Sequence, residues 1–222
     1  MKKIILLVFV LITQLNYSQT TINLGDFDEI KVFDQLNVTL IPSTENKIVV
    51  TGTNQGNVEI VNRNSLLKIR ISLTKILEDN KDLKVNLYFK KIQSIDANEG
   101  SIVSCKAIFK QTTMDLSVQE GAMIEVELDV DNTTTKLNSG GIINLSGKAV
   151  TQKITITSGG ILNAKNLETS QTTVSVSAGG SADVNASTLV DAKVNAGGTI
   201  TIYGKPKQIK QQAFAGGTIT EK

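Results

Sequence analysis

A glycine recurs at a nearly constant interval through the second half of the sequence, with successive separations of 21, 19, 19, 20, 18 and 19 residues. These glycines are Gly100, Gly121, Gly140, Gly159, Gly179, Gly197 and Gly216. In the last five copies a second glycine follows directly, as in "NSGGIINLSG". The second glycines are Gly141, Gly160, Gly180, Gly198 and Gly217. A fixed period of this length is typical of a protein whose copies stack on one another.

Apolar and polar residues alternate in step with these glycines. The third residue after each glycine is apolar in all seven copies: Val103, Ile124, Ile143, Leu162, Ala182, Ile200 and Ile219. The fourth is polar in all seven: Ser104, Glu125, Asn144, Asn163, Asp183, Thr201 and Thr220. The fifth is apolar in six: Cys105, Val126, Leu145, Ala164, Val184 and Ile202. Each copy is therefore predicted to be a strand, a glycine turn and a second strand.

One such copy cannot bury its own apolar face. Stacking the copies about 4.8 Å apart, with equivalent strands paired in parallel, buries that face and satisfies the backbone. The sequence therefore predicts a parallel β-helix with coils of roughly 20 residues. An antiparallel sandwich also has regularly spaced short strands, but it does not require three columns to match in seven copies.

The glycines are interpreted as structural. A tight turn needs the positive φ that glycine reaches at no steric cost, and neighbouring coils pass close at the same corner. Because Ser101 and Ala122 replace the second glycine in the first two copies, we expect the first glycine to be the stricter requirement. A phosphate-binding loop is disfavoured, since a strand and not a helix follows each pair.

Residues 20–92 lack the glycine period but contain strand patterns, and they are predicted to form an all-β region that caps the stack. The repeats, residues 93–222, continue from it without a linker. Strands are expected near residues 30–32, 36–40, 48–50, 58–61, 66–73 and 83–89, with a weaker indication of a helix around Ile76. At the other end, "GGTITEK" predicts an open last coil, covered either by a second copy of the chain or by the tail.

The first 19 residues have the pattern of a secretory signal peptide. Lys2 and Lys3 precede an apolar run from Ile4 to Ile12 that is short for a membrane span, and no later segment is a candidate span. The protein is therefore expected to be exported, to the periplasm, the outer-membrane surface or the extracellular space.

Composition excludes several kinds of protein. The chain has 23 basic and 21 acidic residues, and loss of Lys2 and Lys3 leaves 21 of each, so nucleic acid is not an expected partner. Without histidine there is no Ser-His-Asp or Cys-His triad and no histidine-based zinc site, and no cofactor is expected. The single cysteine, Cys105, forms no internal disulfide and is interpreted as a buried structural thiol.

One strand has four carboxylates on its outward face: Glu125, Glu127, Asp129 and Asp131. They are candidate Ca²⁺ ligands, or the paired carboxylates of a polysaccharide-cleaving enzyme. The preferred interpretation is a solvated strand face, because successive outward residues lie about 6.6 Å apart. Tyr88, Phe89 and Tyr203 are weaker candidates for a sugar-stacking surface.

The segments "FDEIKVFDQLNVTLIPSTENKIVVTG", "SGGIINL", "SGGILNA" and "ITIYGKP" resemble the "putative autotransporter adhesin head" or GIN domain, a domain of unknown function in exported proteins of Bacteroidetes-type bacteria. The resemblance implies a right-handed parallel β-helix in a secreted or cell-envelope protein, with adhesion as the suggested role. It transfers no catalytic residue. We expect a non-enzymatic adhesin or envelope module that contacts glycans or envelope proteins. The alternatives are a polysaccharide-degrading enzyme and a purely structural envelope component.

Overall fold

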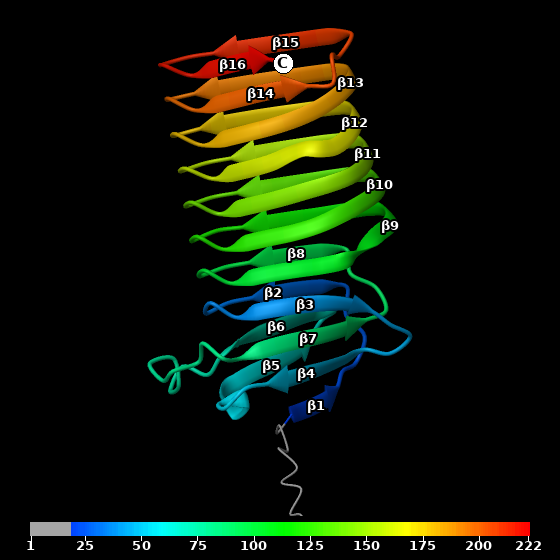
Figure 1. Cartoon of the computed structure of the whole chain (residues 1–222), viewed down its shortest axis with the longest axis vertical. Coiled ribbons are helices and arrows are strands. Elements are labelled where there is room, and N and C mark those ends of the chain that lie inside the picture. The colour runs from blue at the N-terminus through cyan, green and yellow to red at the C-terminus, as the bar shows by residue number, and fades with distance from the viewer. Residues whose placement is uncertain (1–18) are drawn as a thin grey trace, which may run out of the picture.

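The computed structural model describes residues 19–222, which form a right-handed parallel β-helix of about 7 turns of ~19 residues (Figure 1). This confirms the fold class predicted from the repeat. The predicted signal peptide lies outside the described residues except for Gln19, the first residue of the first strand.

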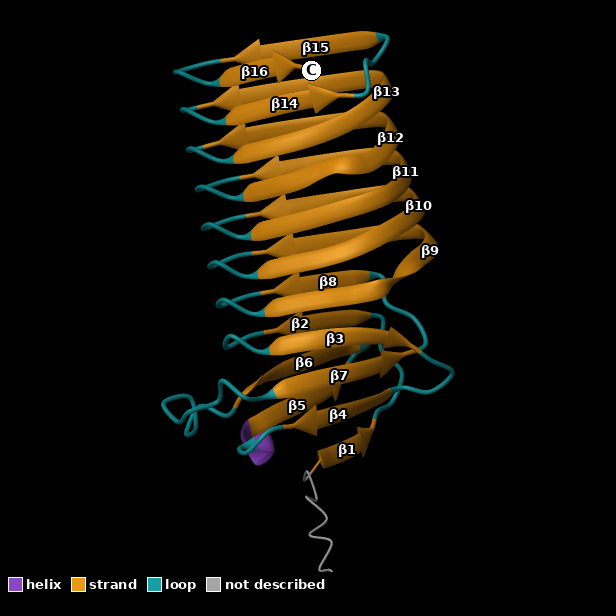
Figure 2. Ribbon diagram, in the orientation of Figure 1, coloured by secondary structure: helices purple, strands orange, loops and turns teal. Residues whose placement is uncertain are grey.

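The central coils are single long strands that run along one face, bend round one edge and return along the other face (Figure 2). They are β9 (Ile102–Val118), β10 (Met123–Leu137), β11 (Ile142–Ile156), β12 (Ile161–Ser177) and β13 (Ser181–Asn195). Each pairs in parallel with the next. Departures from the common period are local: β9 inserts Lys106 and Ala107 between the partners of Glu125 and Glu127. The repeat therefore absorbs extra residues as bulges without losing its register elsewhere.

The core is a set of inward columns, and it confirms the predicted alternation. Ile143 is fully buried and Leu145 is 3% exposed, whereas Asn144 between them faces outward. The same holds for their equivalents in neighbouring coils, because the parallel register places them directly above and below. Burial of each such Ile or Leu side chain contributes about 1.5–3 kcal/mol to the free energy of unfolding. Glu221, the exception in the sequence pattern, is exposed.

Each coil reverses at a two-residue turn in which both residues have positive φ. In one copy these are Ser158 (φ 50°) and Gly159 (φ 79°), and the Gly160 amide donates to the Thr157 carbonyl (3.4 Å). The Gly159 amide instead donates to the Ala178 carbonyl in the next turn (3.1 Å). The hydrogen-bond ladder between coils therefore continues through the turn edge.

The second glycine is needed for a different reason. A Cβ on Gly160 would lie 2.7 Å from the Cβ of Leu137 in the preceding coil, whereas a Cβ on Gly159 would meet nothing within 4 Å. Where Ala122 takes the second position, the residue corresponding to Leu137 is the smaller Ala97. Both glycines are therefore constrained, the first by backbone conformation and the second by close approach of the coils.

The N-terminal coils are stacked out of sequence order. Their strands are β2 (Glu29–Val32), β3 (Asn37–Pro42), β6 (Leu66–Ile71), β7 (Lys84–Phe89) and β8 (Ser94–Ala97). In space, β2 lies between β6 and β8, and β3 lies between β7 and β9. The chain thus forms the β2–β3 coil first and the β6–β7 coil next, on the N-terminal side of the stack. It then forms β8 and β9 on the other side of the β2–β3 coil, where the regular repeat begins.

Antiparallel strands lie outside these coils at the N-terminal end. They are β1 (Gln19–Asn23), β4 (Lys47–Thr51) and β5 (Val58–Arg63). β4 pairs with β7 and β1 with β4, while β5 pairs with β6. The one short helix of the described residues is the 3-10 turn η1 (Gln55–Asn57), so nothing in residues 19–222 has the helical length and apolarity of a membrane span.

The last coils are shorter. They consist of β14 (Thr199–Tyr203), β15 (Gln208–Ala213) and β16 (Thr218–Glu221). β14 and β15 pair with β13, and β16 pairs with β14. Among the described strands, none pairs with the outer edge of β15 or β16.

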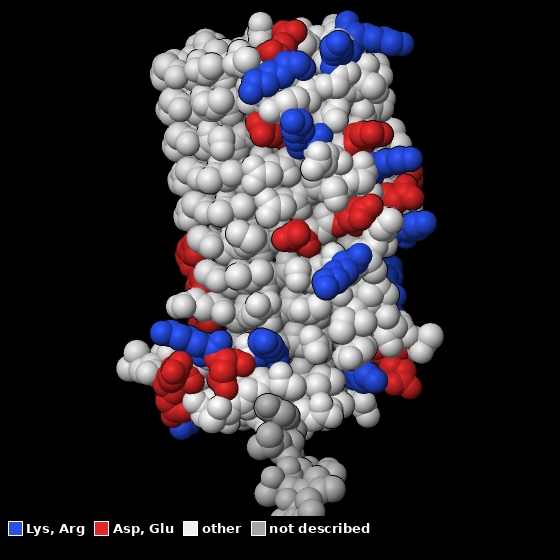
Figure 3. Space-filling model, viewed as in Figure 1, with Lys and Arg blue, Asp and Glu red and all other residues white. Residues whose placement is uncertain are grey.

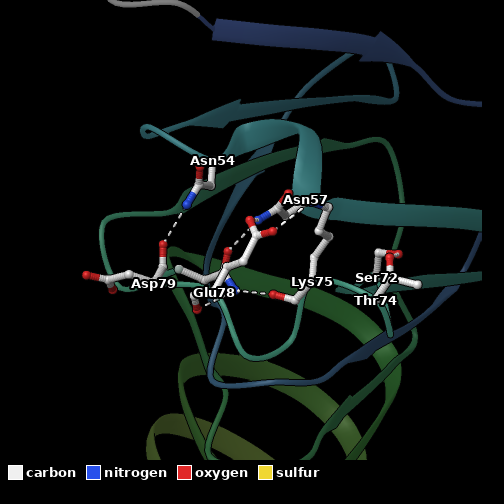
Figure 4. Close-up of polar contacts among 8 residues, drawn as sticks. Asn54, Asn57, Ser72, Thr74, Lys75, Glu78 and Asp79 are labelled. Carbon is white, nitrogen blue, oxygen red and sulfur yellow. Dashed lines mark hydrogen bonds and ion pairs between the residues drawn. The ribbon is translucent and has the colours of Figure 1, made fainter.

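The strands expected in the N-terminal region are present, but the helix expected around Ile76 is absent. Residues 72–83 instead form a loop of turns between β6 and β7. Its shape is held by side chains (Figure 4): the Asn57 amide donates to Glu78 Oε2 (2.9 Å), and Lys75 Nζ donates to Glu78 Oε1 (2.6 Å). At the loop's end, Asp82 Oδ2 accepts from both the amide and the hydroxyl of Thr53 (2.7 Å each).

Substitution should separate the two glycine roles. We expect Gly160→Ala to lower the free energy of unfolding by about 1–3 kcal/mol, because the added methyl overpacks the contact with Leu137. Gly159→Asn should cost less, since asparagine tolerates positive φ better than most residues and its Cβ meets nothing within 4 Å, so that only the backbone strain remains. Urea unfolding followed by circular dichroism measures both. A larger loss of unfolding free energy in Gly159→Asn than in Gly160→Ala would contradict the roles assigned to the two glycines.

The loop should loosen in acid. Hydrogen bonds from Lys75 and then Asn57 lower the pKa of Glu78, and those from Thr53 lower the pKa of Asp82. A lowered pKa in the folded state means that the stabilisation is present at neutral pH and is lost as pH falls through the acidic range where these groups protonate. The protection factors of the amides in residues 72–83, which are exchange rates corrected for the intrinsic effect of pH, should therefore fall in this pH range before those of the central coils. In Glu78→Gln the protection of these amides should depend less on pH. An unchanged pH dependence would argue against the anchoring of the loop by the Glu78 carboxylate.

Candidate functional site

A column of aliphatic side chains lies on the outer surface beside the turn edge. It occupies the second position after the turn glycine in four adjacent coils: Ile102, Met123, Ile142 and Ile161. Ile102 is 40% exposed and Ile161 is 38% exposed, although each precedes a fully inward residue. In the following coils Ser181 and Thr199 take this position. The column is thus a bounded apolar stripe on a polar surface.

A polar column runs parallel to it, two residues further along each strand. Its members in the same four coils are Ser104, Glu125, Asn144 and Asn163. Asn163 Nδ2 donates to Asn144 Oδ1 (2.8 Å), so neighbouring coils are joined by side chains as well as by backbone. We call these two columns of four residues each the ladder face.

A groove of about 690 Å³ adjoins the polar column, where the bulges of β9 and β12 interrupt the register. Lys106 and Glu127 line it together with members of the polar column, and Asn166 lies opposite Ser146. The groove therefore combines a cation, carboxylates and amides within one depression. No such depression could be read from the average repeat, because it arises where coils differ in length.

Cys105 is also part of this groove, and it is 8% exposed. Burial raises the pKa of its thiol, which keeps the thiol protonated and a poor nucleophile at neutral pH. This agrees with the structural role predicted from the sequence.

The four candidate carboxylates are divided between two places. Glu125 and Glu127 line the groove beside the polar column, whereas Asp129 and Asp131 line a second depression of about 540 Å³ further along the coil. Asp129 has Lys110 and Lys148 as its register neighbours on β9 and β11. Within residues 19–222 no three Asp, Glu or Cys side chains are grouped in a way that could hold a metal ion.

The three aromatic candidates do not form one surface. Phe89 is 5% exposed and stacks on Phe109 with ring centroids 5.6 Å apart, so its proposed part in sugar stacking is wrong. Tyr88 lies under Lys47 on β4, and Tyr203 lies under Lys165 (4.8 Å from Nζ to each ring centroid). Tyr88 and Tyr203 belong to β7 and β14, near opposite ends of the stack (Figure 1).

The family profile described as "Putative auto-transporter adhesin, head GIN domain" matches residues 26–206. The chain belongs to this family. Among curated proteins, none matches the sequence significantly.

Several solved structures share the fold of this chain. A "putative adhesin" from Bacteroides fragilis superposes with a TM-score of 0.86 at 18% identity, over 92% of this chain and 96% of that chain. Another "putative adhesin", from Parabacteroides distasonis, superposes with a TM-score of 0.76 at 22% identity, over 92% of this chain and 96% of that chain. A "putative lipid binding protein" from the same species superposes with a TM-score of 0.71 at 16% identity, with the same coverage of both chains. At these identities the likeness establishes the fold of this GIN domain and leaves its ligand open.

The aliphatic column was missed from sequence, although its signal is present. The second position after the glycine is apolar in four consecutive copies and Ser or Thr in the last three. In an alternating strand this position faces outward, so a run of apolar residues there indicates an exposed stripe. The polar column was predicted as outward, but not its amide pairing.

Calcium provides a direct test of the four carboxylates. Because Asp129 lies between two lysines and Glu125 and Glu127 line a different depression, we expect millimolar Ca²⁺ to leave the melting temperature unchanged. Thermal unfolding of wild type and Asp129→Asn, with Ca²⁺ or with Mg²⁺ at equal ionic strength, measures this. A Ca²⁺-specific rise that disappears in Asp129→Asn would contradict the expectation.

Proposed function

We propose that this GIN-domain protein is an exported, non-enzymatic adhesin or cell-envelope interaction module that binds glycans or envelope proteins through the ladder face. The observation that carries the proposal is the pairing of an exposed aliphatic column with a column of hydroxyl, carboxylate and amide groups, both repeated once per coil. In the proposal, residues 20–92 cap the stack, and a second copy of the chain is one means of covering its open last coil.

The chemistry of the ladder face suits a sugar polymer. A pyranose ring has apolar C–H faces and a rim of hydroxyl groups, which match an aliphatic column beside amide and carboxylate groups. Binding sites commonly combine an apolar surface with a few oriented polar groups. The coils repeat about every 4.8 Å, so a chain of sugars along the axis would meet one aliphatic and one polar side chain at each of these four coils. Weak contacts repeated in this way add up to useful affinity.

Polysaccharide cleavage is a second candidate, favoured by one observation. Glu125 and Glu127 line the same groove, and glycosidases use a pair of carboxyl groups that flank the scissile bond. A purely structural envelope component is the third candidate, and it requires neither binding nor cleavage.

Glycan binding and reducing-sugar release, measured on the same preparations, distinguish the three. We expect binding on a glycan array without release of reducing ends. Asn144→Ala combined with Asn163→Ala should weaken that binding about tenfold or more, since two hydrogen bonds to ligand are lost. The control is Thr155→Ala with Ser175→Ala, two register neighbours on the exposed part of the return face. Equal loss in the control, release of reducing ends, or no signal in either assay would contradict the proposal.

A further inference from the structure

Residues 72–83 present an exposed apolar cluster at the turn edge of the first coils. Leu73 is 72% exposed, Ile76 46% and Leu77 98%. The loop that carries them projects from the stack between β6 and β7 (Figure 1). Isolated exposed leucines are ordinary, but three aliphatic side chains within five residues of one projecting loop are typical of a contact surface.

Polar contacts hold the backbone of the loop that carries these apolar side chains. Besides the bonds to Glu78, Asn80 Nδ2 donates to the carbonyls of Lys75 and Glu78 (3.0 and 3.1 Å). Asn54 Nδ2 donates to the Asp79 carbonyl (2.8 Å; Figure 4). An ordered loop loses less conformational entropy on binding than a flexible one.

A groove of about 690 Å³ separates this loop from the turn edge. Ile76 and Leu77 line it from the loop, and Ile71 lines it from the end of β6. Asp34 and Glu99 line it from the turns of the first two coils. An aliphatic side and an acidic side therefore share one groove.

The acidic side belongs to a column confined to this end of the stack. Asp34, Glu99 and Glu120 are the first residues of three successive turns, which are joined by hydrogen bonds from Gln35 to Glu99 and from Gly100 to Glu120 (2.9 Å each). In later turns the same position is uncharged: Ser139, Ser158, Ala178, Ala196 and Ala215. Figure 3 shows acidic side chains on the lower part of this edge and none along its upper part.

The carboxylates of this column are close enough to interact. The pKa of Glu99 is raised, first by a hydrogen bond with the Asp34 side chain, then by partial loss of solvation and by repulsion from Asp34 and Glu120. Among the cations nearby, Lys75 is already paired with Glu78. Lys81 also lines the groove, but it is outnumbered there by Asp34, Glu99 and Asp79. The groove thus carries an excess of negative charge beside its aliphatic side.

We propose that this groove docks an extended segment of a partner protein in which lysine or arginine alternates with aliphatic residues. In an extended chain, alternate side chains point to opposite sides, so one set meets Ile76 and Leu77 and the other meets the acidic turns. Charge complementarity selects a basic partner. The same negative charge disfavours an anionic membrane surface, which attracts basic segments. This surface shares no residue with the ladder face and does not depend on the proposed glycan binding.

Fluorescence anisotropy with a short labelled peptide of alternating leucine and lysine tests the proposal. We expect saturable binding that is at least about tenfold tighter than to a leucine-glutamate or a serine-lysine peptide. Ile76→Ser with Leu77→Ser should weaken it about tenfold or more, and so should Glu99→Gln with Glu120→Gln. All four side chains are exposed, and melting curves verify that the variants are folded.

Matched controls come from the bend edge. Val150 is 53% exposed and Glu168 is exposed, so Val150→Ser and Glu168→Gln make the same chemical changes elsewhere and should leave binding unchanged. Equal weakening by these controls, or no preference for the leucine-lysine peptide, would overturn the proposal. So would a loop-dependent attachment to phosphatidylcholine–phosphatidylglycerol vesicles without peptide binding, which would assign the loop to a membrane.

Discussion

Close hydrogen bonding of each coil to the next is the constraint on which the rest of this structure depends. It runs along both faces and also through the turns, where the Gly140 amide donates to the Ser158 carbonyl (3.1 Å). For the ladder to pass through the turn, two residues must take positive φ and the following residue must lie against the preceding coil. The paired glycines satisfy these two requirements separately, at Gly140 and at Gly141.

Once the coils are in register, the outer surface follows from it. Any residue type that recurs at one position becomes a continuous stripe, because equivalent residues lie directly above one another. The aliphatic column, the Asn144–Asn163 pair and the acidic turns are three such stripes, and each ends where the sequence changes at that position. A solenoid can therefore change the residues of its outer stripes without changing its core.

The regular part of each coil is predictable from the sequence. The inward columns around Ile143 and Leu145 were predictable because a period of two, locked to a period of about 19, leaves one consistent arrangement. The second half of each long strand is less predictable, because Thr133 on β10 and Gln152 on β11 point inward although both are polar. The Thr133 hydroxyl donates to the Met114 carbonyl (3.0 Å), a contact that residue type alone does not indicate.

The stacking order and the grooves were not predictable either. The insertion of β2 and β3 between strands that come later in the chain depends on long-range pairing, which leaves no local pattern. The groove beside the polar column depends on how the bulges of β9 and β12 are accommodated, and periodicity averages over such differences. A helix around Ile76 was only weakly indicated by the sequence, and the turns found there are held by contacts with distant Asn57, which leave no local pattern.

Amide hydrogen exchange at the turns tests most directly whether adjacent coils are joined through their turn edge. The amides of Gly100, Gly121, Gly140, Gly159 and Gly179 lie in short surface turns, yet each donates to the carbonyl of the next turn. Measured residue by residue by NMR, these amides should exchange slowly, at rates close to those of the central strands. Exchange of these amides at the rate of unprotected surface loops would contradict the continuous ladder.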